Sequence, residues 1–360
     1  MLGPRRGGET DVTETYTFQD RSRFTRLLSE KGNINELLAQ ELGERFRSYR
    51  AAWERASNLE LVTDYPIHIG FELNRSCNLR CPMCTWSAEN AQNLGKEGWF
   101  DFERFKTIID DGVPRGLASV ALNWVNEPLL RPDLPRFVAY ARDAGVLDII
   151  IHTNGMLLTE TMAAGLIDGG LTRLMVSLDA VTQSVYDRIR VGADLEVVKR
   201  NVFRFLELRK ARSRRLPLLS VNFVKMSVNE HELERFVETW SPHVDFFAIQ
   251  EYINPFPDRD DKHALTATSL AATLDFKCAQ PYQRVAVQHD GTVSPCCTFY
   301  GADLNVGNAF GRPLGEVWQD APMQALRAMH ARGEYFTNDV CRTCAHNSVV
   351  KHLGQTPVGA

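Results

Sequence analysis

The sequence predicts an α/β fold in which six parallel strands and the helices between them form a partial (β/α)6 barrel. Six short apolar, β-rich runs follow one another between residues 66 and 253, and amphipathic segments separate them. Runs that are apolar almost throughout are typical of parallel strands covered on both faces. Repeated βα units indicate a parallel sheet. We expect the strands at 68–74, 118–124, 148–153, 173–179, 218–224 and 245–251.

An N-terminal helical extension precedes the barrel within residues 1–65. Residues 1–15 are polar and rich in Gly and Pro, so we expect a mobile tail there. From residue 18 to about residue 59, charged residues and Leu, Phe and Ala recur at helical spacing, and Gly32 and Asn33 suggest a break. We expect two or three helices, and helices only, in this extension.

The alternation of strands and helices stops after residue 253. Residues 254–275 are rich in Pro, Asp, Thr and Ala and predict a linker. Residues 276–350 contain five cysteines and a hairpin-like run in which Asp290 and Gly291 form a strong turn dipeptide. We expect a small separate domain organised by metal there, followed by a tail at 351–360.

Composition excludes several classes of partner. The chain has 360 residues, 44% of them hydrophobic and 24% charged, and its formal net charge is −4. No charge of one sign dominates, so we expect no nucleic-acid and no membrane partner. No apolar run of about 18 residues and no secretory signal is visible, so we expect a cytoplasmic protein. Its eight cysteines would then be reduced, and their clustering indicates metal ligation.

Three of these cysteines form a C-x3-C-x2-C loop, Cys77, Cys81 and Cys84, directly after the first expected strand. Such loops, at the carboxyl ends of parallel strands, are where α/β folds place their active sites. A structural zinc requires four ligands, and the loop contains no His and no fourth Cys. Thiolates suit iron–sulfur clusters, and three thiolates on a four-iron cluster leave one iron open. The alternatives are a chance zinc site and buried thiols.

The loop resembles that of the radical S-adenosylmethionine (SAM) superfamily, and segments after later strands strengthen the resemblance. Members bind SAM at the open iron and cleave it to a 5′-deoxyadenosyl radical, which abstracts a substrate hydrogen. The resemblance implies an external electron donor such as flavodoxin or ferredoxin. Val125 and Asn126 replace both glycines of the family's GGE-type segment. The SAM contacts that the resemblance implies are Met83 at the adenine, Asn126 and Glu127 at the amino group, Ser177 and Asp179 at the ribose and carboxylate, and the strand-end residues Thr153 and Asn154.

The C-terminal cysteines are spaced C-x17-C-x44-C-x2-C, which is compatible with zinc or with an iron–sulfur cluster. Beside a radical SAM core, this segment resembles the SPASM/twitch auxiliary-cluster domain in its shortened twitch form. The resemblance implies a second 4Fe-4S cluster that accepts an electron, with a purely structural cluster as the alternative. Its implied ligands are Cys278, Cys296, Cys341 and Cys344. Cys297 could replace Cys296 as a ligand; otherwise it is a small buried residue or, in an epimerase, a hydrogen donor.

We therefore expect a radical SAM oxidoreductase that oxidises an alcohol of a small-molecule substrate (a sugar, an aminocyclitol or a nucleoside) to a ketone. The well-studied twitch enzymes do this to an aminocyclitol, which suggests antibiotic biosynthesis. Glu251 and Tyr252 are candidate substrate contacts, and we cannot assign a general base. The alternatives are an epimerase, a decarboxylase, a maturase of ribosomally made peptides, and a non-enzymatic zinc-binding protein. The helix-only extension argues against the leader-binding domain of a peptide maturase.

Overall fold

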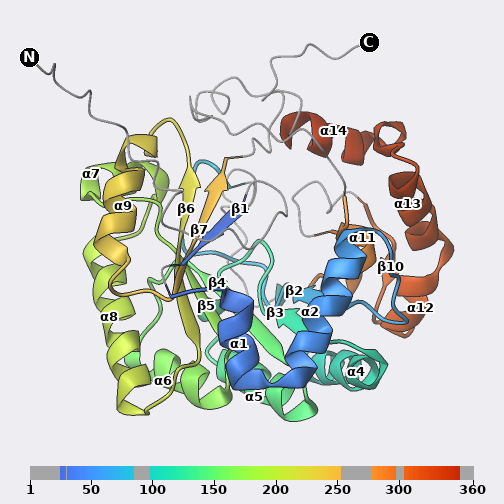
Figure 1. The fold of residues 1–360 in the computed structure, drawn as a ribbon, viewed down its shortest axis with the longest axis horizontal. Coiled ribbons are helices and arrows are strands. Elements are labelled where there is room, and N and C mark those ends of the chain that lie inside the picture. Colours follow the sequence, from blue (N-terminus) through green and yellow to red (C-terminus); the bar gives the residue numbers. More distant parts are fainter. Residues whose placement is uncertain (1–24, 30, 85–97, 253–277, 297–303, 349–360) are drawn as a thin grey trace, which may run out of the picture.

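A computed structural model of the chain describes residues 25–29, 31–84, 98–252, 278–296 and 304–348. Its centre is one ten-stranded sheet (Figure 1), in the order β1-β7-β6-β5-β4-β3-β2-β8-β9-β10. Strands β2 to β7 are parallel neighbours, and the sheet does not close on itself. This arrangement confirms the predicted partial barrel.

All six predicted strands are present. They are β2 (His68–Phe71), β3 (Ser119–Ala121), β4 (Asp148–Thr153), β5 (Arg173–Ser177), β6 (Leu218–Lys225) and β7 (Phe246–Glu251). The first, second and fourth end two or three residues before the predicted position, because the chain leaves the sheet there to form the loops at its carboxyl edge. These loops carry the first three cysteines and the candidate residues Met83, Asn126, Glu127 and Asp179.

The two faces of the sheet pack against different helices. On the outer face, strand residues such as Ile149 and Val221 form one apolar core with the surrounding helices. These helices are α4 (Phe102–Gly112), α5 (Leu134–Ala144), α6 (Glu160–Gly169), α7 (Gln183–Ile189), α8 (Leu195–Ala211) and α9 (Leu233–Trp240). On the inner face, Met175 and Phe246 pack on Phe46 and Trp53. These two aromatic residues come from α2 (Glu44–Ser57), which lies beside α1 (Ile34–Leu42) across the strands (Figure 1).

The N-terminal extension contains a strand that the sequence analysis did not predict. Residues Thr25–Leu28 form β1, which pairs antiparallel with β7 at the edge of the sheet. The expectation of helices only is therefore wrong at this segment. A four-residue run is too short to show a strand period, and its strand conformation depends on hydrogen bonds to β7. The two predicted helices are present, and Asn33 caps α1 through its side chain.

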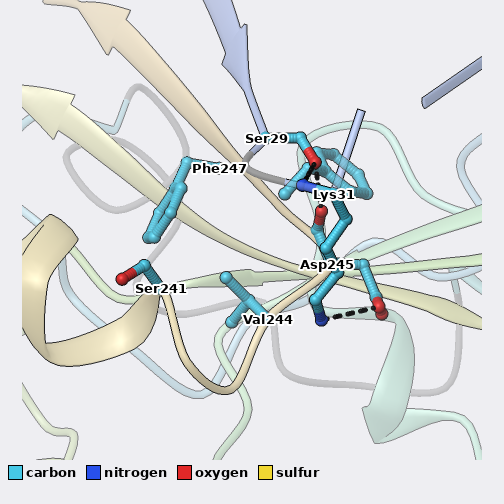
Figure 2. A pocket seen from close by; sticks show the side chains of 7 residues that line it. Ser29, Lys31, Ser241, Val244, Asp245 and Phe247 are labelled. Atoms are coloured by element: carbon cyan, nitrogen blue, oxygen red, sulfur yellow. Dashed lines mark hydrogen bonds and ion pairs between the residues drawn. The ribbon is translucent and has the colours of Figure 1, made fainter. Parts of the chain in front are cut away.

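A hydrogen bond and an ion pair connect the residues that follow β1 to the barrel. The Ser29 hydroxyl donates to the Asp245 carbonyl (2.8 Å), and the Lys31 ammonium lies 3.2 Å from the Asp245 carboxylate (Figure 2). The same carboxylate accepts from Arg209 at 2.6 Å and from the Leu219 amide at 2.8 Å. The small pocket bounded by these side chains lies at the amino end of β7, at the edge of the sheet opposite the cysteine loop.

The C-terminal segment joins the same sheet. Strand β8 (Arg284–Val287) pairs parallel with β2, and β9 (Thr292–Ser294) and β10 (Gly307–Asn308) extend the sheet antiparallel. The predicted turn between β8 and β9 is present, with Gly291 at a φ of +85° that favours glycine. The helices of this segment are α11 (Gln280–Gln283), α12 (Leu314–Gln319), α13 (Ala321–Ala331) and α14 (Asp339–Ser348). The expected linker 254–275 and the two expected tails lie outside the described residues.

Within the described ranges, the helices are all too short or too polar to cross a lipid bilayer.

Candidate functional site: the cysteine loop and its surroundings

The three-cysteine loop leaves the carboxyl end of β2, as the sequence predicted. Cys81 is buried, whereas Cys77 and Cys84 are half-buried, and the Cys84 amide donates to the Cys81 carbonyl at 3.1 Å. Burial, together with the nearby charges of Glu127, Cys81 and Cys84, raises the pKa of the Cys77 thiol to about 12. Burial also raises the pKa of Cys81, and the charge of Cys84 adds to the effect. The three thiols therefore lie within electrostatic reach of one another.

Three neighbouring loops hold this loop in place. The Glu127 amide donates to the Ser76 carbonyl at 2.9 Å, from the loop after β3. After β4, the Asn154 side-chain amide donates to Asn78 Oδ1 at 2.8 Å. After α7, the Val191 carbonyl accepts from the Arg80 amide at 2.9 Å. The cysteines are thus positioned by contacts between segments far apart in the sequence.

Glu127 and Thr153, which the sequence placed in one site, are in contact. The buried Glu127 carboxylate accepts from the Thr153 hydroxyl at 2.7 Å, the Asn154 amide at 2.8 Å and the Leu129 amide at 3.0 Å. Burial raises the pKa of Glu127, and these hydrogen bonds oppose the increase. Both carboxylate oxygens are engaged within the protein, so the side chain of Glu127 connects the loops after β3 and β4.

Asn126 and Met83 lie beside this connection. The Asn126 side chain donates to Asn74 Oδ1 at 2.6 Å and accepts from the Trp124 amide at 2.9 Å. It therefore joins the loop after β3 to the residues that precede the cysteines. Met83 is 9% exposed and packs in the main apolar core.

Asp179 lies where predicted along the chain, but its carboxylate faces the protein. The residue is fully buried, with a left-handed φ of +64°. One carboxylate oxygen accepts from the Val224 amide at 2.7 Å, and the other accepts from Arg190 Nε at 2.7 Å. Both carboxylate oxygens are thus engaged within the protein, and a direct contact of this side chain with SAM stays a prediction. Ser177, two residues earlier on the inner face, is half-buried and is the more accessible of the two.

Arg190 connects Asp179 to the cysteines. Its guanidinium donates to the sulfur of Cys81 at 3.8 Å while it is ion-paired with Asp179. Burial alone would lower the pKa of Arg190, but the charges of Asp179 and Cys81 outweigh it and raise the pKa, so the guanidinium stays charged. Sequence reasoning missed this residue. The contact spans 109 positions, and the only local signal is a basic residue just after α7.

The candidate substrate residues lie at the carboxyl end of β7. Glu251 shares the outer face with Phe247 and Ile249, and its carboxylate is ion-paired with the Lys225 ammonium at 2.7 Å. Tyr252 follows it and is 4% exposed. The alternation along β7 instead places Gln250 on the inner face. Glu251 is thus directed toward the outer face, and its role as a substrate contact stays a prediction.

The inner face is polar and partly accessible toward the carboxyl ends of the strands. On β4 to β7, the inner-facing residues there are half-buried, whereas their outer-facing neighbours other than Lys225 are buried. The half-buried polar residues are His152, Ser177, Asn222 and Gln250. Burial, with Arg173 and Arg284 nearby, lowers the pKa of His152 to about 4, so its imidazole is neutral at pH 7.

The C-terminal cysteines occupy the segment that extends the sheet. Cys278, Cys296 and Cys344 are buried and Cys341 is half-buried, with its sulfur 3.6 Å from His330 Nε2. His330 lies on α13 and was not singled out by the sequence. Cys297 lies outside the described residues. Across the described ranges, no three His, Cys, Asp or Glu side chains meet closely enough to hold a single metal ion.

Comparison with protein families finds two matches. A model of the radical SAM superfamily matches residues 71–239, and a model of an iron–sulfur cluster-binding domain, SPASM, matches residues 278–345. The first match covers β2 to α9 and includes the three-cysteine loop. The second covers the C-terminal cysteines from Cys278 to Cys344.

Relatives of known annotation include probable GTP 3′,8-cyclases of Methanococcus maripaludis. The protein of strain C6 is 30% identical over 213 residues, which are 59% of this chain and 67% of that protein. The protein of strain S2 is 30% identical over 187 residues, and the chain covers 59% of its length. An AdoMet-dependent heme synthase of Methanosarcina barkeri is 33% identical over 129 residues, 36% of each protein.

Two solved structures share the fold. SuiB of Streptococcus suis, bound to S-adenosylmethionine, aligns with a TM-score of 0.60 at 15% identity, covering 84% of this chain and 75% of SuiB. BtrN, in complex with AdoMet and 2-DOIA, aligns with a TM-score of 0.50 at 20% identity, covering 78% of this chain and 94% of BtrN. At these identities the likeness concerns the fold.

Proposed function

This chain belongs to the radical SAM superfamily and carries a C-terminal iron–sulfur cluster-binding domain, and from that premise we propose that it oxidises an alcohol of a small polar substrate to a ketone. Its cofactors are SAM and 4Fe-4S clusters. When bound and reduced by an external flavodoxin or ferredoxin, the first cluster and SAM would supply a 5′-deoxyadenosyl radical that removes a hydrogen atom from the substrate. The second cluster would accept the electron that the substrate then loses. The proposed substrate is a sugar, an aminocyclitol or a nucleoside.

The donor set fits a four-iron cluster with three protein ligands. Three soft thiols from one short loop lie within electrostatic reach of one another, and Arg190 puts a positive charge beside Cys81, which favours the thiolate that iron binds. In such a cluster each thiolate binds a different iron, so its ligands lie farther apart than around a single ion. We propose Cys77, Cys81 and Cys84 as ligands of the SAM cluster.

The C-terminal donor set fits a cluster that is fully ligated by protein. Cys278, Cys296 and Cys344 are buried, and Cys341 lies beside His330, so all four thiols are withdrawn at least partly from solvent. Four thiolates saturate a four-iron cluster. We propose these four cysteines as its ligands. Such a cluster has no open iron for SAM and is suited to electron transfer.

The chain's own residues shape the space around SAM. Glu127 and Asn126 tie together the loops that follow β2, β3 and β4, and Asp179 holds Arg190 against the cysteine loop. We propose that these are positioning roles and that backbone groups of the same loops, with Ser177 and Met83, contact SAM. The half-buried His152 and Gln250 then present polar groups toward a substrate on the inner face.

The observation that carries the oxidation proposal is the pairing of β8 with β2. Cys77 follows β2 and Cys296 follows β9, so the two sets of cysteines are attached to nearby strands of one sheet. A second contact secures the junction, because the buried Glu72 carboxylate lies 3.0 Å from His289 Nδ1. A second cluster attached to the same sheet as the first supports a reaction in which the substrate loses an electron.

Anaerobic reconstitution tests the proposal. Iron and sulfide are counted, and SAM cleavage is followed with a panel of sugars, aminocyclitols and nucleosides. We expect a ketone product and 5′-deoxyadenosine in equal amounts. The C77A/C81A/C84A variant should retain about four irons per chain and form no 5′-deoxyadenosine. SAM cleavage retained in that variant would contradict the ligand assignment. Solvent deuterium incorporated without net oxidation would identify an epimerase.

Modification of a peptide is the second candidate, and β1 supports it. The helix-only extension was the argument against a peptide substrate, and β1 removes that argument by placing a strand at the edge of the sheet. The structure of SuiB bound to its precursor peptide SuiA shows that a protein of this fold binds a peptide. Peptide libraries added to the same SAM-cleavage assay distinguish the two candidates, since only one substrate class should stimulate 5′-deoxyadenosine formation.

A further inference from the structure

Tyr186 carries a hydroxyl group with no role in the described fold. The residue is fully buried on α7, and its Oη has no hydrogen-bond partner among the described residues. A buried hydroxyl that lacks a partner destabilises a protein by roughly 1–3 kcal/mol. Such a group needs an explanation, and an unseen acceptor beside it is the simplest one.

The position of Tyr186 indicates where an acceptor for its hydroxyl would lie. Tyr186 and Arg190 are four residues apart at the end of α7, and the Arg190 amide donates to the Tyr186 carbonyl at 2.7 Å. Residues at this spacing lie on the same side of a helix. Arg190 reaches the sulfur of Cys81, so the side of α7 that carries Tyr186 faces the cysteine loop. Burial raises the pKa of the Tyr186 hydroxyl. The charge of Arg190 opposes the increase, and the charges of Asp179 and Cys81 add to it.

We infer that the Tyr186 hydroxyl donates a hydrogen bond to a sulfur atom of the cluster bound by Cys77, Cys81 and Cys84. The inference rests on the proposed assignment of these cysteines as cluster ligands. The cluster gains negative charge on reduction, so a donor to one of its sulfurs stabilises the reduced form more than the oxidised form. Tyr186 would therefore raise the reduction potential of this cluster and make it easier for a flavodoxin or ferredoxin to reduce.

The inference predicts different effects of removing the Tyr186 hydroxyl in the iron-free and in the iron-loaded protein. Without iron, the Tyr186 hydroxyl has no acceptor among the described residues, so removing it should not lower the stability of the protein. With the cluster in place, removing the hydroxyl breaks the inferred hydrogen bond to the cluster. Tyr65 provides the matched control, because it is also fully buried but its hydroxyl donates to the Ile108 carbonyl at 3.1 Å. The Y65F change breaks a bond that exists in both states.

The experiment compares wild type, Y186F and Y65F, each as the full-length chain with and without reconstituted clusters. EPR-monitored redox titration gives the potential of the SAM-responsive cluster, and thermal unfolding gives Tm. We expect Y186F to shift that potential to a more negative value and to lower Tm of the iron-loaded protein only. Y65F should lower Tm in both states and leave the potential unchanged.

The outcomes are distinct. A Y186F protein without iron that is as stable as wild type but takes up less iron also supports the inference. The inference fails if Y186F has the wild-type potential and wild-type Tm when loaded. It fails equally if Y186F loses the same stability with and without iron, since the hydroxyl would then have a partner in the polypeptide. Neither failure affects the ligand assignment, which fails only if C77A/C81A/C84A still cleaves SAM.

Discussion

The guanidinium of Arg190 lies 3.8 Å from the sulfur of Cys81 and is held there by the buried carboxylate of Asp179. A fixed positive charge thus lies beside one proposed ligand of the SAM cluster. Net charge and hydrogen bonds to sulfur are two of the factors that set the potentials of iron–sulfur clusters.

Removal of this charge should make the cluster harder to reduce. In R190M the methionine fills similar volume without a charge or a donor, so we expect the potential of the SAM cluster to become more negative and the rate of SAM cleavage to fall at least tenfold, about 1.4 kcal/mol in barrier. EPR titration and a 5′-deoxyadenosine assay measure the two effects. R188M, at an exposed position on the same helix, is the control and should match wild type.

Asp179 should matter for stability more than for binding. D179N keeps the side-chain shape and tolerates the left-handed φ, but it leaves the buried Arg190 without its ionic partner. We expect a loss of about 3 kcal/mol in the free energy of unfolding, measured in urea on the reconstituted protein. D187N, at an exposed position on α7, should cost less than about 0.5 kcal/mol. A loss of SAM affinity with unchanged stability would instead indicate a direct contact.

The inner face should make the protein sensitive to mild acid. Burial, with Arg173 and Arg284 nearby, lowers the pKa of His152 to about 4, whereas the unfolded chain takes up the proton near pH 6.5. The stability that this depressed pKa contributes is present above pH 6.5 and is lost as pH falls toward 4.

H152Q should remove part of this dependence. Between pH 7 and pH 5 the free energy of unfolding should fall by up to about 2 kcal/mol less in H152Q than in wild type. Urea unfolding at the two pH values measures the difference. His231, which is exposed, supplies the control variant H231Q, and its stability at pH 7 should equal that of wild type. An identical fall in H152Q and wild type would contradict the prediction.

His330 should affect the second cluster only. Its Nε2 lies 3.6 Å from the sulfur of Cys341. A cysteine that binds iron as a thiolate can only accept, so H330F would remove a donor to this proposed ligand if the proton is on Nε2. We expect a more negative potential for the auxiliary cluster, partial recovery in H330Q, and an unchanged potential for the cluster that responds to SAM. If H330F shifted both potentials, a general distortion of the fold would explain the result better.

Cys297 should be dispensable for iron binding if Cys296 is the ligand. Cys296 is buried directly after β9, at the end of a rigid hairpin. We expect C297A to bind as much iron as wild type and C296A to lose about four irons per chain. The reverse pattern would exchange their roles. Loss of turnover in C297A with full iron content would support an epimerase.

The parts of the fold that the sequence predicted are those with strong local patterns. Runs such as DIIIHT at 148–153 are apolar enough to mark a buried parallel strand without knowledge of its neighbours. Strand β1 has no such pattern and exists because β7 offers it hydrogen bonds. The parallel pairing of β8 with β2 likewise joins segments more than 200 residues apart, beyond the reach of any local signal.

The residues of the candidate site likewise differ in how well the sequence predicts them. The cysteines and Glu127 belong to short motifs that can be recognised in a single sequence, whereas Arg190 contacts a cysteine 109 positions away in the chain. The direction of the Glu251 side chain could also have been predicted. The run FFAIQE alternates between faces, and since Phe247 and Ile249 are suited to the apolar outer face, Gln250 rather than Glu251 is the inner-facing residue.

The continuous hydrogen-bonded ladder from β2 into β8 makes the two halves of the protein a single cooperative unit. Oxidative damage that releases the C-terminal iron would loosen α13 and α14 first and then expose the edge of β2, next to Cys77. Oxidation of the C-terminal cluster would thereby lead to loss of the SAM cluster as well. Backbone amide hydrogen exchange at Ile69 and Phe71 should accelerate when iron is removed only from the C-terminal cysteines.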